Sequence, residues 1–482
     1  MRVSRRSVLV SSVGALVVAA FDPRRRAWLS VANADAPDAV HVPKLDGELA
    51  FDAATLAEAS RDFGGIIEHA PWAVLRPASV GDVAAVIRFA RRHGLSVAMR
   101  GQAHSVFGQA QAAAGIVIDS RTLATVHTID ANGAWVDAGV TWRELLTQAT
   151  AADLTPPVLT DYLDLSVGGV LSVGGIGGAT HRFGFVADNC LELEVVTGQG
   201  VIVRCSADRH ARLFDAVLGG LGQCAIIVRA RIALKSAKPL ARVHQLTYLD
   251  LDAFLRDQRI ACDDERFDFL QGLVALTPAG DKAFIMQGAR WYAPDAPPSD
   301  STALAGLTPT ASEVQDLPYA AWAARVDANV AQWKAAGVWT TPHPWCDLFL
   351  PDDQINAFAA RALAELAPAD LGAGVILLYP FKRRPLTRPL VRVPGTDTLW
   401  LFDLLRVSGP GTTAVDTLLA KNRELLERAV ANGGKRYPIS AVGLTPDDYP
   451  LHYDELWSVF TAAKRTWDPD RILTPGQSIF RA

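Results

Sequence analysis

The predicted strands in the first half of this 482-residue chain are joined by tight turns rather than by helices. VHTID and AWVDAG flank Ala131-Asn132-Gly133, and LELEVVT and VIVRC flank Gly198-Gln199-Gly200. Apolar, branched segments on both sides of a glycine-containing turn are typical of antiparallel hairpins. Hairpins with helices packed beside them favour an α+β fold over a doubly wound parallel sheet.

Two helices in the same region are predicted from their first residues. Ser79 with Asp82, and Thr141 with Glu144, have the spacing of a helix-capping box. After Ser79, apolar residues recur at helical spacing until Gly94. The sequence therefore predicts a helix ending near Gly94, a strand over 95–99, and a loop after that strand.

Length and composition exclude several classes of protein. A chain of 482 residues is too long for one compact core and should divide into two or three domains. Half of the residues are hydrophobic and the net charge is −4, so neither extended disorder nor nucleic-acid binding is indicated. The five cysteines include no C-x-x-C pair, and we therefore expect buried free thiols, no disulfide framework and no metal site.

The N-terminus has the pattern of an export signal. Ser4-Arg5-Arg6 leads into the apolar run VLVSSVGALVVAAF, and small residues follow at 32–36. Paired arginines before such a run indicate the twin-arginine route, which exports folded proteins. A membrane anchor is the alternative, but about fourteen apolar residues fall short of the ~20 that span a bilayer. We therefore expect residues 1–36 to be a signal, with a periplasmic or extracellular protein and no integral membrane segment.

The loop that follows strand 95–99 contains a histidine among small residues. In MRGQAHSVFGQA, His104 could be a metal ligand, a satisfied core residue or an attachment point for a cofactor. The segment SVGGVLSVGGIGG, residues 166–178, lacks the preceding strand that a dinucleotide-binding fingerprint needs. Its glycines instead suit backbone that approaches a flat or phosphorylated ligand, with a structural loop as the alternative.

Seven segments together resemble flavoprotein oxidoreductases of the vanillyl-alcohol-oxidase type, and most closely the cytokinin dehydrogenases. They follow the family order from about residue 60 to the C-terminus: RDFGGIIEHAPWAVLRPAS, HSVFGQA, TDYLDLSVGGVLS, LELEVVTGQG, DAVLGGLGQ, HPWCDLFLP and LTPGQSIF. The resemblance implies an FAD-binding domain of the PCMH type, made of two α+β subdomains, and a substrate-binding cap domain. The cap would have a large antiparallel sheet flanked by helices.

Domain boundaries follow from this resemblance and from a change in composition near residue 237. We expect the signal over 1–36, the FAD-binding domain over 37–236 and the cap domain over 237–440. Residues 441–482 would return to the FAD-binding domain.

The resemblance makes His104 the covalent attachment point of FAD. In the family this histidine is bonded to the 8α-methyl group of the flavin, and a ring nitrogen is a suitable nucleophile for such a bond. None of the cysteines lies between Ser166 and Gly178, so a single bond is expected. Two departures from the usual plant motif, Gln102 and Ala103, indicate altered phosphate contacts.

Asp161 in the T-D-Y-L motif corresponds to the family's proton acceptor. As hydride leaves the carbon beside nitrogen, the nitrogen becomes iminium-like, and a nearby carboxylate can take its proton. A turn aspartate is the alternative role, and the more common one after threonine. The match to the motif favours the catalytic role.

The resemblance also assigns residues to the cofactor and the substrate. We expect FAD to contact Met99, Gly101, Gln102, Ala103, His104, Ser105, Gln109, Asp161, Ser166, Ser172, Ile176, Ile227, Tyr449, Thr474 and Gln477. Asp161, Leu386 and Leu451 would border the substrate, although YPLHY and YPFKRRPL differ from the family pattern. Trp345 and Phe349 would line or support the pocket, with core packing as the alternative.

The resulting hypothesis is a secreted amine dehydrogenase that cleaves the side chain of N6-substituted isoprenoid adenines. Its product imine would hydrolyse to adenine and an aldehyde, and O2 or a quinone would reoxidise the flavin. One alternative keeps the fold but oxidises another alcohol, sugar or amine. Another is a flavoprotein that binds a ligand without turnover.

Overall fold

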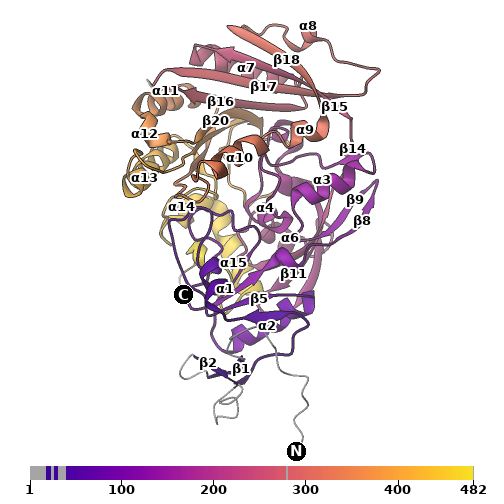
Figure 1. Ribbon diagram of the computed structural model, residues 1–482, viewed down its shortest axis with the longest axis vertical. Coiled ribbons are helices and arrows are strands. Elements are labelled where there is room, and N and C mark those ends of the chain that lie inside the picture. Colours follow the sequence, from indigo (N-terminus) through magenta and orange to yellow (C-terminus); the bar gives the residue numbers. More distant parts are fainter. Residues whose placement is uncertain (1–17, 23–26, 31–39, 278–279, 481–482) are drawn as a thin grey trace, which may run out of the picture.

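The computed structural model describes residues 18–22, 27–30, 40–277 and 280–480. Within them the chain forms an α+β structure around three main sheets, as predicted. Figure 1 shows the third sheet at one end of the molecule and the first sheet towards the other, with helices packed on both.

The first sheet has the strand order β4-β5-β7-β6. Its β5–β7 and β6–β7 pairs are parallel, whereas β4–β5 is antiparallel. Helix α2 crosses between two of its strands, and the predicted capping box of Ser79 and Asp82 is present at its start. The elements are β4 (Glu48–Ala50), α1 (Ala53–Ala59), β5 (Ala73–Arg76), α2 (Val80–Arg92), β6 (Val97–Arg100), β7 (Ile116–Asp119) and η2 (Ser120–Thr122).

The second sheet is antiparallel throughout, with the order β12-β11-β13-β9-β8. Both predicted hairpins are present, as β8–β9 and β11–β12, and Thr141 caps the predicted helix α3. The elements are β8 (Val126–Asp130), β9 (Gly133–Asp137), α3 (Trp142–Thr150), α4 (Val167–Val173), α5 (Thr180–Phe183), η3 (Val186–Asn189), β11 (Cys190–Thr197), β12 (Ile202–Ser206), α6 (Ala211–Val217) and β13 (Ala225–Ile232).

The third sheet is large and antiparallel, which confirms the expected form of the second half. Its order is β18-β15-β17-β16-β20-β21-β19-β22. The strands are β15 (Leu240–Tyr248), β16 (Phe269–Leu276), β17 (Lys282–Tyr292), β18 (Ala311–Pro318), β19 (Cys346–Pro351), β20 (Val375–Lys382), β21 (Thr398–Leu405) and β22 (Lys435–Arg436). The helices between them are α7 (Leu251–Asp263), α8 (Asp300–Ala303), α9 (Tyr319–Ala323), α10 (Asp327–Ala335), α11 (Ile355–Glu365), α12 (Pro368–Leu371) and α13 (Val415–Ala431).

The last segment of the chain packs against the first half. Leu473 pairs in parallel with Val97, and the Thr474 amide donates to the Val97 carbonyl over 2.7 Å. The elements here are α14 (Tyr449–Tyr453), η4 (Asp454–Leu456), α15 (Trp457–Trp467) and η5 (Pro475–Gln477). In Figure 1 this segment begins at α14, beside α13, and continues in yellow to α15, which lies beside α1 and β11.

Most of the predicted signal lies outside the described residues. Two short strands within it, β1 (Val18–Asp22) and β2 (Ala27–Ser30), pair with each other, and β1 also pairs with β3 (Val40–His41). The Phe21 ring is buried 6.1 Å from the Phe89 ring. A further small sheet joins β10 (Leu154–Thr155) to β14 (Lys235–Ser236). Export and the boundaries of the domains remain predictions.

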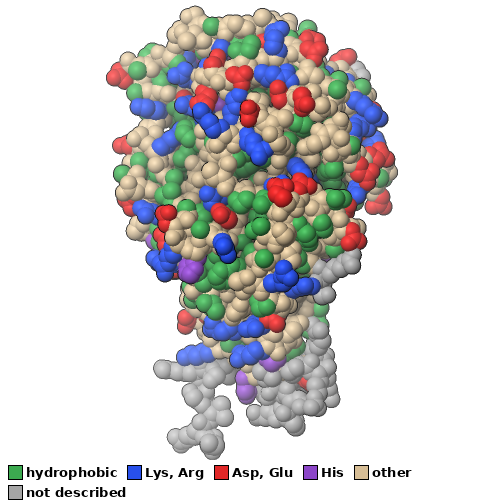
Figure 2. Space-filling model, turned by 180° about the vertical axis from the view of Figure 1, so that it is seen from behind, with side chains coloured by type: hydrophobic (Ala, Val, Ile, Leu, Met, Phe, Trp, Pro, Cys, Tyr) green, Lys and Arg blue, Asp and Glu red, His purple; other side chains and the backbone are tan. Residues whose placement is uncertain are grey.

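The described residues indicate no charged binding surface on the face drawn, no membrane-spanning helix and no metal site. Figure 2 shows acidic and basic side chains mixed over one face of the molecule, without a large area of one sign. Among the described residues, no helix has both the length and the apolar character needed to cross a membrane. The same residues contain no cluster of three or more histidine, cysteine or acidic side chains suited to a metal ion.

Candidate active site

A cleft of about 1090 Å³, counting its open mouth, runs between the loop after β6, the start of α4 and the C-terminal segment. Segments 221–227 and 438–439 complete its walls. Most of the predicted cofactor residues lie on these walls, although they come from sequence positions far apart: Met99, Gly101, Gln102, Ala103, His104, Ser105, Gln109, Ser166, Ser172, Ile227, Thr474 and Gln477.

The loop after β6, which contains Gly101, and the glycine-rich segment 166–178 lie close together at the wall of the cleft. A Cβ atom at Gly101 would lie 2.0 Å from the Ser166 Oγ, so only glycine fits there without a shift. The Ser166 side chain in turn accepts a hydrogen bond from the Gly169 amide over 3.3 Å and caps α4. The loop after β6 and the start of α4 therefore pack closely where both border the cleft, and the approach of the glycine-rich backbone to a ligand stays a prediction.

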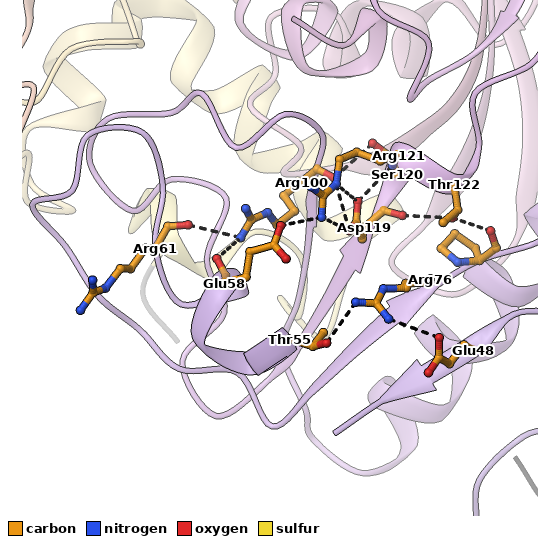
Figure 3. A network of polar contacts seen from close by, with 11 residues as sticks. Glu48, Thr55, Glu58, Arg61, Arg76, Arg100, Asp119, Ser120, Arg121 and Thr122 are labelled. Atoms are coloured by element: carbon orange, nitrogen blue, oxygen red, sulfur yellow. Dashed lines mark hydrogen bonds and ion pairs between the residues drawn. The ribbon is translucent and has the colours of Figure 1, made fainter. Parts of the chain in front are cut away.

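A buried guanidinium contributes to the same wall. The Arg100 Nη1 donates to the carbonyl of Glu58 over 2.7 Å and to that of Arg61 over 3.2 Å. Neighbouring Arg121 pairs with Asp119 and Glu58, as Figure 3 shows. The Arg100 Nε is buried without a hydrogen-bond partner among the described residues. Burial lowers the pKa of Arg100, but an arginine still keeps its charge at neutral pH. Arg100 therefore places a positive charge at the wall, whereas its unpartnered Nε is buried and not accessible from the open cleft.

Asp62 fixes the loop that carries the histidine. Its Oδ2 accepts hydrogen bonds from the Ser105 Oγ over 3.0 Å and from the Gly108 amide over 2.7 Å. Burial raises the pKa of Asp62 to about 6. Since these bonds lie on both sides of 106–107, they hold the loop in one conformation beside the cleft.

The His104 ring packs in an aromatic cluster at the border of the cleft. Its centroid lies 4.0 Å from the Phe63 ring, 5.1 Å from the Tyr162 ring and 5.7 Å from the Trp345 ring. Trp339 and His343 complete this aromatic cluster. Burial lowers the pKa of His104 to about 4, so the ring is neutral at pH 7 and has a nitrogen lone pair available.

Ala103 adopts a backbone conformation that favours glycine. Its φ is +55°, in the left-handed region that costs an L-residue roughly 1–2 kcal/mol. Ala103→Gly should therefore raise the free energy of unfolding by about 0.5–1 kcal/mol, despite the added freedom of glycine in the unfolded chain. Urea unfolding measures this change, with Ala110→Gly on the same loop as the control. A destabilised Ala103→Gly variant would contradict the expected relief of strain.

Asp161 is held by two residues of the second half of the chain. Its Oδ1 forms an ion pair with Arg325, and its Oδ2 accepts a hydrogen bond from the Gln271 Nε2 over 2.6 Å. Asp161 directly precedes Tyr162, which packs against the His104 ring. The predicted proton acceptor therefore lies near the predicted attachment point, although it does not line the cleft itself.

Two further carboxyl groups are buried in the third sheet. Asp347 on β19 and Asp403 on β21 are cross-strand partners, and they are 0% and 4% exposed. The Oδ1 atoms of both have no hydrogen-bond partner among the described residues. Burial raises the pKa of Asp347 to about 6, and burial followed by the charge of Asp347 raises that of Asp403 well above its usual range. At least one carboxyl is therefore protonated at neutral pH.

The buried carboxyl groups of Asp347 and Asp403 should make the free energy of unfolding depend on pH. A carboxyl whose pKa is raised on folding stabilises the fold fully below its unfolded pKa, near 4, and loses that contribution as the pH rises through its folded pKa. Asp403→Asn removes the cost of ionising this carboxyl. The free energy of unfolding of the variant, relative to that of the wild type, should therefore be higher at pH 8 than at pH 4.5 by roughly 1–3 kcal/mol. Urea unfolding at both pH values measures this, with exposed Asp416→Asn as the control. A pH-independent difference would contradict it.

Besides Asp161, four predicted site residues do not line the cleft. Ile176 packs in a hydrophobic cluster with Phe185 and Tyr379. The Tyr449 hydroxyl donates to the Gln477 carbonyl over 2.6 Å, so it supports the wall from behind. Leu386 lines a separate surface pocket, and Leu451 is 71% exposed. Phe349 is buried in the same cluster as Ile176, which fits the core-packing alternative, whereas Trp345 lies beside His104.

Sequence reasoning missed Arg325, Gln271, Arg100 and the buried carboxyl pair. Asp347 and Asp403 each stand alone in an apolar run, CDLFL and LFDLL, and this pattern indicates a buried acid. Arg325 and Gln271 reach Asp161 only through the packing of two halves of the chain, for which the sequence has no local signal. The five cysteines are buried free thiols, and none is among the described residues that line the cleft.

Two family models and a solved structure match this chain. Residues 71–206 match the family model described as an FAD binding domain. Residues 299–480 match the model described as cytokinin dehydrogenase 1, FAD and cytokinin binding. The structure resembles 6-hydroxy-D-nicotine oxidase from Arthrobacter nicotinovorans, with a TM-score of 0.71 and 21% identity, over 89% of this chain and 96% of that one. At that identity the match shows the fold alone.

Curated relatives match almost the whole chain. Cytokinin dehydrogenase 9 from Oryza sativa subsp. japonica is 32% identical over 496 residues, which cover 94% of each chain. An uncharacterized oxidoreductase, ORF5 in the fasciation locus of Rhodococcoides fascians, is 39% identical over 424 residues, 87% of this chain and 96% of that one.

Fold, cleft and family models together define an FAD-dependent oxidoreductase. More closely, the chain belongs to the cytokinin dehydrogenase family. The predicted recognition and the predicted class of enzyme are thereby confirmed.

Proposed function

We propose that this enzyme oxidises the N6 side-chain amine of isoprenoid adenines and releases adenine and an aldehyde. The match to a cytokinin-binding family model and the relatives named cytokinin dehydrogenase support this substrate. The observation that carries the proposal is the placement of Asp161, one residue from the Tyr162 ring that packs 5.1 Å from the His104 ring. An acid for the substrate nitrogen and an anchor for the cofactor therefore share one site.

The cleft fits FAD. The positive charge of Arg100 and the glycines on the walls of the cleft suit an anionic diphosphate group. We propose a covalent link through the ring of His104, supported by the neutral state of this half-buried imidazole. A single bond is proposed because no cysteine is among the described residues on the walls.

The proposed reaction assigns one proton-transfer step to the protein. Bound FAD would supply a two-electron acceptor for the hydride of the carbon beside N6. Asp161 accepts the proton of the substrate nitrogen, and Gln271 and Arg325 hold its carboxylate in place. The N–H and C–H bonds of the substrate are replaced by a C=N bond. Water then hydrolyses this imine to adenine and the aldehyde.

Two alternatives share the cleft. The enzyme could oxidise another alcohol, sugar or amine, or the protein could hold flavin and ligand without turnover. We retain O2 or a quinone as the proposed acceptor, and export to the periplasm or beyond by the twin-arginine route as the proposed localisation.

Product analysis distinguishes these functions. Purified enzyme is incubated with isopentenyl-adenine and a quinone or O2, and adenine and 3-methyl-2-butenal are quantified by mass spectrometry. Equal amounts of both products support the proposal. Turnover of sugars or alcohols with no adenine formed would favour the first alternative, and no turnover of any of these compounds would favour the second.

A further inference from the structure

We infer that Arg325 makes the site of Asp161 select neutral amines over cationic ones. This inference rests on the proposed function, in which Asp161 receives the substrate nitrogen. It concerns which protonation state of an amine the site binds.

Both oxygens of the Asp161 carboxylate are engaged. Arg325 pairs with Oδ1 and Gln271 donates to Oδ2 over 2.6 Å. The Asp161 side chain is 26% exposed and that of Arg325 is 15% exposed, so solvent screens the pair only in part. The charge of the acid is therefore compensated before any substrate arrives.

The guanidinium of Arg325 is held firmly in this position. It lies 4.4 Å from the centroid of the Phe269 ring and 4.9 Å from that of Trp322, and these two rings contact each other edge to face at 5.3 Å. Stacking on two rings stabilises a cation by its attraction to their faces. Arg325 itself lies between α9 and α10, which Figure 1 shows between the third sheet and α4.

The other titratable groups around Asp161 add little positive attraction. Tyr379 on β20 and Asp403 on β21 both have raised pKa values, to which the charge of Asp161 contributes, and burial is the main cause in each case. Both are therefore neutral or protonated at neutral pH. Asp161 and Arg325 therefore form a pair whose net charge is close to zero.

A site of zero net charge discriminates between amines by the cost of desolvation. An ammonium group loses its hydration on entry, and its attraction to Asp161 is offset by repulsion from Arg325. A nitrogen attached to an aromatic ring, as in an N6-substituted adenine, is neutral at pH 7 and can still donate its N–H to the carboxylate. The neutral amine therefore binds without the penalty that an ammonium group meets.

Binding of two probes that cannot transfer hydride tests this inference on the flavin-loaded enzyme. N6-tert-butyladenine is neutral and tert-octylamine is cationic at pH 7, and neither has hydrogen on the carbon beside nitrogen. Dissociation constants are measured by perturbation of the flavin absorbance. In Arg325→Met the dissociation constant of tert-octylamine should fall at least ~10-fold, while that of N6-tert-butyladenine changes less than ~3-fold.

Three matched variants complete the test. Arg325→Lys keeps the charge and should bind both probes as the wild type does. Arg361 is an exposed arginine that pairs with Glu365, and Arg361→Met should change neither constant. Asp161→Asn leaves Arg325 uncompensated and should weaken binding of tert-octylamine selectively, which tests the inference even where Arg325→Met does not fold.

Two results would overturn the inference: an unchanged constant for tert-octylamine in Arg325→Met, or parallel changes for both probes. Reduction of the wild-type enzyme by isopentenyl-adenine is measured separately. Failure of that reaction would remove the proposed substrate while the binding data still decide the role of Arg325.

Discussion

Replacing His104 with alanine is expected to leave FAD that acid precipitation separates completely from the protein. In the wild type the yellow colour should stay with the pellet, because the neutral, half-buried imidazole of His104 forms the proposed covalent bond. Loss of covalently bound FAD should be complete, because no cysteine that could form a second bond is among the described residues that line the cleft. Absorbance of the pellet and supernatant, together with the mass of the intact chain, measures the bound fraction.

A matched histidine controls for the loss of an aromatic ring. His343 stacks on the opposite side of the same Phe63 ring, with centroids 3.9 Å apart, and does not line the cleft. His343→Ala should retain covalent FAD. Colour that remains in the pellet of His104→Ala would contradict the attachment through this residue.

Replacing Asp161 with asparagine is expected to slow reduction of the flavin by an amine substrate by about 10²–10⁴-fold, the usual contribution of a general base. The amide keeps the shape of the side chain and can keep one of the two hydrogen bonds that Asp161 accepts, but it cannot accept the proton. FAD content should be unchanged, because Asp161 does not line the cleft. Anaerobic stopped-flow absorbance measures the rate of reduction.

The neighbouring acid on the same loop is the control for this variant. Asp164 pairs with Arg143 and is 41% exposed. Asp164→Asn should reduce the rate less than ~3-fold. Equal rates for Asp161→Asn and the wild type would remove Asp161 from the mechanism.

The sequence predicted those features that depend on local chemistry. The Ser79 and Thr141 caps, both hairpins and the α+β class follow from nearby side chains and turns, and the structure contains them. Most of the cofactor residues predicted from the family motifs line the cleft, because the loops on its walls are short and contiguous. The first sheet also has parallel pairs, which the hairpin pattern did not indicate.

Features that depend on packing between distant segments were not predicted. Arg325 reaches Asp161 across 164 positions of sequence, and Asp347 meets Asp403 only through the register of β19 and β21. Leu386 and Leu451 lie in segments that depart from the family pattern, and the structure places neither on the cleft. A family motif is a poor guide to the position of a residue where the surrounding sequence departs from the motif.

Anaerobic titration of the purified enzyme with isopentenyl-adenine tests the central claim most directly. The account predicts loss of the oxidised flavin absorbance near 450 nm with one equivalent of substrate, together with release of adenine. An oxidised flavin that is unchanged by excess isopentenyl-adenine would contradict the proposed reaction.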